Sequence, residues 1–223
     1  MRVPTGCNSL DSLLKGGVEA GAVTEFFGEG GSGKTNVCLQ LARNVALDDK
    51  KVIYVDTEGV SIERLKQISG DESEEVLKNI LFFKAHSFKE QEQSLQKASN
   101  LALGENMNIH LLIVDSFTIF YRTLFNSDEK EGLSSRLGRQ LVDLLRIARI
   151  KEIPVIVTTQ VYESGDGKQP VGGHILYHNA KTIIKLEILA PHLRKGTIVK
   201  HRSQAEKDSV KFKITDEGLV TPD

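Results

Sequence analysis

Cysteine is scarce in this sequence, and this scarcity argues against two kinds of protein. The 223 residues include two cysteines, Cys7 and Cys38. Two thiols provide neither the framework of a disulfide-stabilised secreted domain nor the clustered ligands of a structural zinc site. We therefore expect a protein of the reducing cytosol, in which both thiols are small core or near-surface residues.

Long apolar runs are also absent. No stretch reaches the ~18–20 apolar residues that a membrane span needs, and the longest strong runs, at 111–114 and 153–157, suit buried strands. The first residues lack the apolar segment of a secretory signal. These absences predict a cytoplasmic protein that has no membrane partner.

The sequence also has almost no net charge. The formal net charge is −1, so the overall composition does not indicate nucleic acid as a partner. The charges are nevertheless uneven, because 56–75 holds seven acidic residues and 192–213 holds seven lysines and arginines. The basic segment is compatible with DNA binding, and it is equally typical of a solvated β-hairpin.

Apolar runs alternate with helical patterns along most of the chain. Strands are predicted at 22–27, 52–55, 80–83, 111–114 and 155–159, and helices at 35–47, 63–68, 73–77, 89–103 and 133–151. Nearly continuous apolar strands between helices are typical of a mostly parallel, twisted sheet that is covered on both faces. The length suits a single α/β domain spanning 1–223.

The pattern changes after Gln160. Glycines and a proline between 165 and 173 predict a mobile loop. Strands are predicted at 182–188, 197–200 and 210–214 without long helices between them, joined by a turn near 194–196 and a charged loop at 204–208. We expect these strands to be antiparallel and to extend one edge of the sheet.

A glycine-rich segment follows the first of the parallel strands and precedes a helix. It matches the pattern G-x-x-x-x-G-K-[ST] of a phosphate-binding P-loop, with the residues Gly28, Glu29, Gly30, Gly31, Ser32, Gly33, Lys34 and Thr35. Glycines let successive backbone N–H groups point at phosphate oxygens, and the helix adds its positive N-terminal end. Lys34 is predicted to bind the β- and γ-phosphates and Thr35 to coordinate Mg²⁺. The segment predicts binding of a nucleoside triphosphate, with ATP as the expected cofactor.

Three further residues lie where parallel strands are predicted to end. Asp115 follows the apolar run 111–114 and is expected to hold Mg²⁺ through water beside the P-loop. Glu58 follows the strand at 52–55 and is a candidate base for the attacking water, and Gln160 follows the strand at 155–159 and is a candidate sensor of the γ-phosphate. Each also has a structural interpretation, as a surface acid or an ordinary strand-end amide.

With these motifs in order, essentially the whole chain resembles the RecA/RadA recombinase family, and most closely its short archaeal RadB paralogues. The resemblance rests on the opening at 4–18, the P-loop, the segment 54–59, the strand ending in Asp115, the segment 132–136, the strand ending in Gln160 and the segment 170–174. It implies a RecA-like P-loop NTPase core, and it places the water-activating glutamate at Glu58 and the sensing glutamine at Gln160. The two DNA-binding loops of the family then fall around 116–136 and between Gln160 and Gly172.

The sequence also departs from the strand-exchange enzymes. We expect no N-terminal DNA-binding domain, since the ATPase core begins almost at Met1. The second loop spans about eleven residues, and the first carries Asp128-Glu129-Lys130-Glu131, whose acidic charge opposes a phosphate backbone. The resemblance to RadB proteins implies an accessory protein of homologous recombination. Such a protein binds ATP and DNA, hydrolyses ATP weakly and does not exchange strands. The implied partners are single-stranded or branched DNA, the main recombinase of the RadA type and a Holliday-junction resolvase.

Candidate DNA contacts follow from the same resemblance. They are Arg122 and Arg136 beside the first loop, Arg139 one turn further along, and the basic cluster Lys200-His201-Arg202. Each is also a reasonable solvated or ion-paired surface residue. His174 and His178 have a spacing that suits a metal on a helix, but no third ligand is evident near them in the sequence.

Three other functions are compatible with a P-loop in an α/β protein. An autonomous strand-exchange recombinase would act as an ATP-dependent filament. A small-molecule P-loop kinase usually has an arginine-rich lid over the phosphates, and no compact insertion with paired arginines is found in the sequence. A signalling or circadian-clock-like ATPase of the same fold is the remaining alternative.

Overall fold

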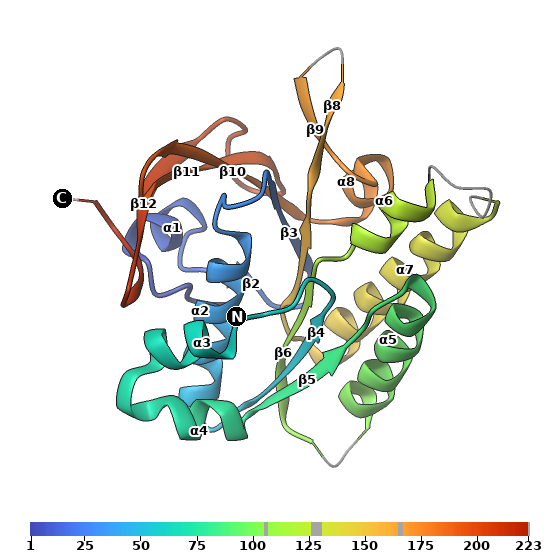
Figure 1. Ribbon diagram of the computed structural model, residues 1–223, viewed down its shortest axis with the longest axis horizontal. Helices are drawn as coiled ribbons and strands as arrows, with labels where there is room; N and C mark the ends of the chain where they lie inside the picture. Colours follow the sequence, from blue (N-terminus) through green and yellow to red (C-terminus); the bar gives the residue numbers. More distant parts are fainter. Residues whose placement is uncertain (105–106, 126–130, 165–166, 223) are drawn as a thin grey trace.

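The fold is built around one large sheet. The computed structural model of the protein describes residues 1–104, 107–125, 131–164 and 167–222. Among these residues a sheet of nine strands has the order β13-β12-β11-β10-β3-β7-β6-β4-β5 (Figure 1). The parallel strands are β3 (Val23–Gly28), β4 (Lys51–Asp56), β5 (Ile80–Lys84), β6 (Ile109–Asp115), β7 (Val155–Thr159) and β10 (Thr182–Ala190). The antiparallel strands are β11 (Leu193–His201), β12 (Ser209–Thr215) and β13 (Gly218–Val220).

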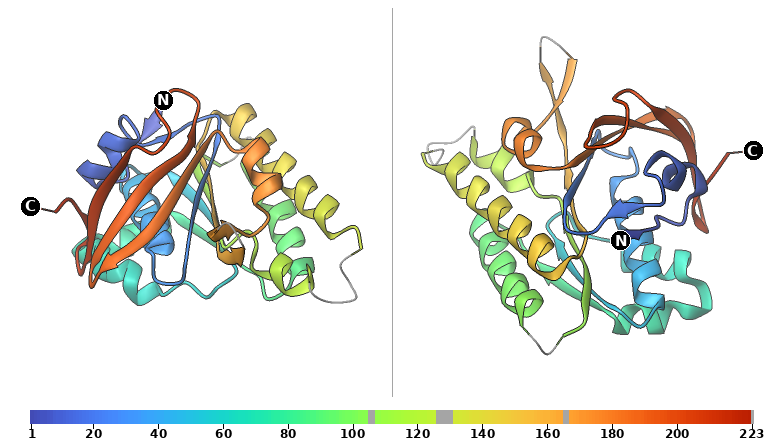
Figure 2. Two further views of the ribbon diagram at one scale, coloured as in Figure 1. Left: turned by 90° about the horizontal axis from the view of Figure 1, so that it is seen from above. Right: turned by 180° about the vertical axis from the view of Figure 1, so that it is seen from behind.

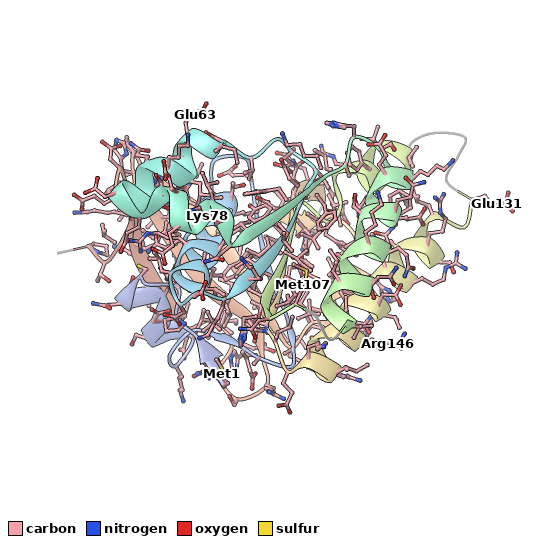
Figure 3. All side chains as sticks on the ribbon, turned by 90° about the horizontal axis from the view of Figure 1, so that it is seen from below. Met1, Glu63, Lys78, Met107, Glu131 and Arg146 are labelled. Atoms are coloured by element: carbon pink, nitrogen blue, oxygen red, sulfur yellow. The ribbon has the colours of Figure 1, made fainter. Side chains whose placement is uncertain are left out.

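Helices cover both faces of this sheet, as the sequence pattern predicts. One apolar cluster packs one face against α1 (Asn8–Leu13), α2 (Lys34–Leu47), α3 (Ile62–Ser69) and α4 (Ser73–Lys78). A second cluster packs the other face against α5 (Phe88–Leu103), α6 (Ile119–Phe125), α7 (Leu133–Lys151) and α8 (Gly173–Asn179). Figure 2 shows the two helical layers from above and from behind. In Figure 3 the labelled side chains of Glu63 on α3 and Arg146 on α7 lie on opposite sides of the molecule.

The smaller elements lie at the margins of the sheet. The strands β1 (Arg2–Val3) and β2 (Val18–Glu19) pair with each other next to the beginning of the chain, and a 3-10 turn, η1 (Gly70–Glu72), joins α3 to α4. The strands β8 (Val161–Ser164) and β9 (Gly167–Pro170) form a hairpin that projects away from the sheet (Figure 1). Among the described helices, none has the length and apolar character needed to span a membrane.

Several predictions after Gln160 are wrong in detail. The strand predicted at 182–188 as antiparallel runs parallel to β3 and is antiparallel only to β11. The predicted turn at 194–196 lies inside β11, and the chain turns between Ala190 and Leu193 instead. Gly196 is needed for close packing, because a Cβ there would lie 3.2 Å from Leu10 Cδ2. The predicted loop at 165–173 contains β9 and the start of α8.

A buried carboxyl group lies in the central strand β3. Glu25 is 0% exposed, and its Oε1 accepts a hydrogen bond from Thr159 Oγ1 at 2.6 Å. No described residue bonds its Oε2. Burial disfavours the ionised form and raises the pKa of Glu25 to about 7, although the bond from Thr159 acts in the opposite direction. The sheet therefore contains a carboxyl group that titrates near neutral pH.

This titration predicts how stability depends on pH. In the unfolded chain Glu25 ionises near the ordinary glutamate pKa of 4.5, whereas in the folded protein the pKa is about 7 and the proton is held longer. The folded state therefore loses up to roughly 3 kcal/mol of stability as the pH rises through that window. We expect Glu25→Gln to remove most of this loss, measured as the free energy of unfolding by urea at pH 5 and pH 8. Glu74→Gln controls for removal of a carboxylate, and an unchanged pH dependence in Glu25→Gln would contradict the assignment.

Candidate functional site

The predicted site residues come together at one edge of the sheet. Parallel strands present their carboxyl ends at the same edge, and this edge carries Gly28 at the end of β3, Asp56 at the end of β4 and Asp115 at the end of β6. Gln160 directly follows β7, which lies between β3 and β6. Motifs that are far apart in the sequence thus form one cluster.

The P-loop has the backbone that its glycines permit. Gly31 and Gly33 have φ values of 76° and 102°, in the left-handed region that favours glycine. At Gly28 the constraint is space, because a Cβ would lie 2.3 Å from the carbonyl oxygen of Leu186 and 2.7 Å from Ser32 Oγ. The helix α2 begins directly after this loop, at Lys34.

The polar groups of the loop fit a triphosphate. Lys34 is 6% exposed, and its Nζ donates to the carbonyl oxygens of Gly28 and Glu29, both at 2.9 Å. Burial lowers the pKa of Lys34, and the negative charges of Glu58 and Asp115 act in the opposite direction. The buried Ser32 hydroxyl bonds to no other described residue. A buried ammonium and an unpartnered hydroxyl in a glycine loop suit an anionic ligand.

Asp115 is held by two hydroxyl groups from the neighbouring strands. It is 1% exposed, and its two carboxylate oxygens accept hydrogen bonds from Tyr54 (2.8 Å) and Thr158 Oγ1 (2.5 Å). Burial and the charge of the same carboxylate raise the pKa of Tyr54 well above its ordinary value, so its hydroxyl remains a donor. Both oxygens are thus oriented by protein donors, which suits indirect binding of Mg²⁺ through water.

Three predicted residues form a hydrogen-bonded chain. Gln160 Nε2 donates to Glu58 Oε1 at 2.8 Å, and Arg122 Nη1 on α6 donates to Gln160 Oε1 at 3.1 Å. The amide of Gln160 therefore donates to the candidate base, Glu58, and accepts from a candidate DNA contact, Arg122. This connection between the two predicted sites is not evident from sequence spacing.

The loop that carries Glu58 is fixed by its neighbours. The buried carboxylate of Asp56 accepts hydrogen bonds from the backbone N–H groups of Glu58 (3.2 Å), Gly59 (2.8 Å) and Val60 (2.9 Å). Thr57 Oγ1 donates to the Ser116 carbonyl and accepts from its backbone N–H, at 2.7 Å each. Glu58 itself is exposed, so a fixed backbone presents a solvated carboxylate.

A pocket of about 370 Å³ lies beside the P-loop. It is lined by Arg64, His192, Ile214, Thr215 and Asp216. Arg64 donates to Asn36 in the first turn of α2, and Ile214 packs so close to the loop that a Cβ at Gly33 would lie 3.0 Å from it. A planar guanidinium in this place suits stacking on a flat ring.

Most of the candidate DNA contacts already have partners within the chain. Arg136 forms an ion pair with Glu92 at 2.5 Å and lies over the Phe88 ring. Lys200 bonds the Tyr177 carbonyl and lies 5.0 Å from that ring, and Arg202 is paired with Glu19. Arg122 and Arg139 are exposed. Asp128, Glu129 and Lys130 of the first loop lie outside the described residues.

The two histidines singled out in the sequence lie close together on one helix. His174 and His178 lie on α8 with their ring centroids 4.8 Å apart. No group of three or more potential metal ligands occurs in the described part of the chain.

Sequence reasoning missed the residues that orient this site: Tyr54, Asp56, Thr158 and Arg64. A signal existed for two of them. A tyrosine inside an apolar strand needs a partner for its hydroxyl, and an aspartate at a strand end favours caps and turns. Arg64 gave no local signal, because its partners in β12 and the following turn are distant in the sequence.

The glycines of the P-loop differ in the space around them, which gives a matched pair of variants. Gly28→Ala places a methyl group against the Leu186 carbonyl, so we expect it to cost about 1–3 kcal/mol of stability. At Gly30 a Cβ would meet no atom within 4 Å, and Gly30→Ala should change stability by less than about 0.5 kcal/mol. Thermal unfolding of both variants without nucleotide tests this, and equal melting temperatures would contradict it.

Comparisons with known proteins point to one family. The Rad51 family model matches residues 1–222. The chain is 42% identical over 222 residues to the DNA repair and recombination protein RadB of Archaeoglobus fulgidus, covering 98% of both chains. It is 41% identical over 219 residues to the protein of that name from Methanococcoides burtonii, covering 96% of both. A crystal structure described as the RadB recombinase superimposes with a TM-score of 0.85 at 37% identity, covering 99% of this chain and 100% of the other. The chain therefore belongs to the Rad51/RecA-like recombinase family, and within it to the RadB proteins.

Proposed function

We propose that this chain is an ATP- and DNA-binding accessory protein of homologous recombination and DNA repair. The observation that carries the proposal is the chain of hydrogen bonds from Glu58 through Gln160 to Arg122. It joins the nucleotide edge of the sheet to the region where the family resemblance implies DNA binding. The names of the RadB relatives, which describe DNA repair and recombination proteins, support the same assignment.

In this proposal the P-loop binds ATP with Mg²⁺. Lys34, the Ser32 hydroxyl and the loop N–H groups hold the phosphates, while Thr35 and Asp115 hold the metal ion. The adenine ring of the nucleotide would then lie in the pocket beside Arg64 and Ile214. ATP with Mg²⁺ would supply the γ-phosphoryl group, and the protein would position this group and stabilise its negative charge.

Hydrolysis is expected to be weak. Glu58 would accept the proton of the attacking water, and Gln160 would orient that carboxylate. Glu58 is exposed, so bulk water competes with the attacking water for its carboxylate. A solvated base suits a switch that is set by ATP binding better than a rapid ATPase.

The DNA-binding role rests on the exposed arginines and the resemblance. Arg122 on α6 and Arg139 on α7 are exposed. The proposed partners are single-stranded or branched DNA, a RadA-type recombinase and a Holliday-junction resolvase. We propose that residues 1–223 act as a single ATPase core that does not exchange strands, because its second loop is a short hairpin, β8–β9.

Two variants separate nucleotide binding from hydrolysis. Lys34→Ala removes a buried charge from the phosphate site, so ATP affinity should fall by roughly 10- to 100-fold. Glu58→Gln keeps the hydrogen-bonding shape of the side chain, and it should preserve ATP binding while abolishing the residual hydrolysis. Fluorescent-nucleotide titration and phosphate release measure these effects, with Lys66→Ala on exposed α3 as the control. Undiminished hydrolysis in Glu58→Gln would refute the role of Glu58.

The DNA contacts are tested by the salt dependence of binding. Neutralising Arg122 and Arg139 together should reduce the slope of log K against log salt by roughly 1.4 for single-stranded DNA. The matched control is Lys97→Gln with Arg149→Gln, which removes the same charge from exposed positions on α5 and α7. Titration of a labelled oligonucleotide at several salt concentrations gives the slopes. Equal slopes for both double variants would argue against specific contacts at Arg122 and Arg139.

A further inference from the structure

The helix α5 holds the guanidinium group of Arg136. Its Nε donates to Glu92 Oε1 at 3.0 Å, and its Nη2 donates to Glu92 Oε2 at 2.5 Å. The same group lies over the Phe88 ring, with its Cζ 4.8 Å from the ring centroid. Glu92 and Phe88 are one turn apart at the start of α5. Arg136 therefore meets a carboxylate and an aromatic face on the same helix, in the paired geometry that guanidinium groups form with carboxylates.

The surroundings of this ion pair are fixed by buried hydrogen bonds. Gln91, next to Glu92, is 0% exposed, and its Nε2 donates to the Phe117 carbonyl oxygen (3.0 Å) and to Gln140 Oε1 (2.8 Å). Phe117 lies between β6 and α6, and Gln140 is one turn after Arg136 on α7. The helices α5 and α7 lie side by side (Figures 1 and 2). Neighbouring residues of α5 thus hold the chain before α6 and at the start of α7, and Glu92 stays opposite Arg136.

The ion pair is only partly shielded from solvent. The side chains of Arg136 and Glu92 are 35% and 31% exposed. A phosphate group can therefore approach the guanidinium, but it needs the N–H groups that already bond Glu92. The carboxylate also repels a phosphate at this range. A phosphate that binds Arg136 must therefore displace Glu92.

The other two arginines near the first loop lack such a competitor. Arg122 donates to the neutral amide of Gln160, and Arg139 is exposed. Neither of them forms an ion pair with a carboxylate in the described part of the chain. Of the three, Arg136 is the arginine whose charge is balanced by a carboxylate of the same chain.

We propose that Glu92 is an autoinhibitory residue, which withholds Arg136 from DNA. The inference rests on the proposed DNA-binding function and names how that site is regulated. A strand first meets the accessible arginines, Arg122 and Arg139. Arg136 joins them when a phosphate of that strand displaces Glu92. The carboxylate therefore lowers the affinity for DNA until a bound strand competes for the guanidinium.

The first test removes the charge of Glu92. Glu92→Gln keeps the length of the side chain, and it should raise the affinity for a labelled oligothymidine by roughly two- to fivefold. The slope of log K against log salt should become steeper by roughly 0.7, because Arg136 gains a phosphate. Glu90→Gln is the matched control, since it removes the same charge from an exposed position of α5 and leaves Arg136 paired. Its slope should equal that of the wild-type protein.

The second test asks whether Arg136 carries the gain. Arg136→Gln alone should change the affinity little, because the wild-type protein withholds this arginine. Combined with Glu92→Gln, the same substitution should abolish the gain, so the two changes are not additive. Glu92→Ala removes the acceptor entirely, and it should raise the affinity at least as much as Glu92→Gln. Thermal unfolding shows that each variant is folded.

The outcomes separate this inference from the proposed function. Unchanged or weaker DNA binding in both Glu92 variants overturns it, because the ion pair then serves to join α5 to α7. An equal effect of Arg136→Gln with and without the Glu92 carboxylate overturns it too. Both results leave the proposed DNA binding intact, whereas no binding by the wild-type protein at low salt overturns that function and the inference together.

Discussion

The site depends above all on the two hydrogen bonds that hold the carboxylate of Asp115. Tyr54 on β4 and Thr158 on β7 donate to it from the strands on either side of β6. A buried carboxylate is unfavourable unless its oxygens are satisfied, so these contacts fix the side chain and also the relative positions of three strand ends. Glu58 follows β4 and Gln160 follows β7, and both are carried into place by the same strands. The buried carboxylate of Asp115 thus sets the geometry of the candidate hydrolytic groups.

A second buried carboxyl group lies in the strand β3. Burial raises the pKa of Glu25 to about 7, against the effect of the hydrogen bond that it accepts from Thr159. Its donor, Thr159, directly precedes Gln160, as the donor of Asp115, Thr158, precedes Thr159. The two adjacent threonines at the end of β7 therefore serve opposite faces of the sheet. These two contacts explain why β7, which directly precedes the candidate sensor Gln160, carries polar residues at fully buried positions.

Sequence reasoning located the elements that have strong periodicity or a fixed motif. The five strands from 22 to 159 and the long helices were found because burial on both faces gives apolar runs, and the P-loop because its chemistry requires glycines at set positions. The short helices α1, α6 and α8 were missed, since six or seven residues provide too little periodicity. The turn near Gly196 was misplaced because a glycine that makes room for Leu10 looks the same in sequence as a turn glycine. The partners of Arg136 and Arg202 depend on distant segments, which spacing does not reveal.

The contact between Gln160 and Arg122 gives the two candidate sites a common element. A side-chain amide has one carbonyl end and one NH₂ end, and here each end bonds a different site. A ligand that engages Glu58 or Gln160 from the nucleotide side changes the free energy of the Arg122 contact. By linkage, a strand that engages Arg122 must change the affinity for the nucleotide by the same factor. One hydrogen bond of this kind is worth on the order of 1.5–3 kcal/mol, so the change in nucleotide affinity is limited to roughly 10- to 150-fold. That range is large enough to set the state of the proposed accessory protein, and it requires no rapid turnover of ATP.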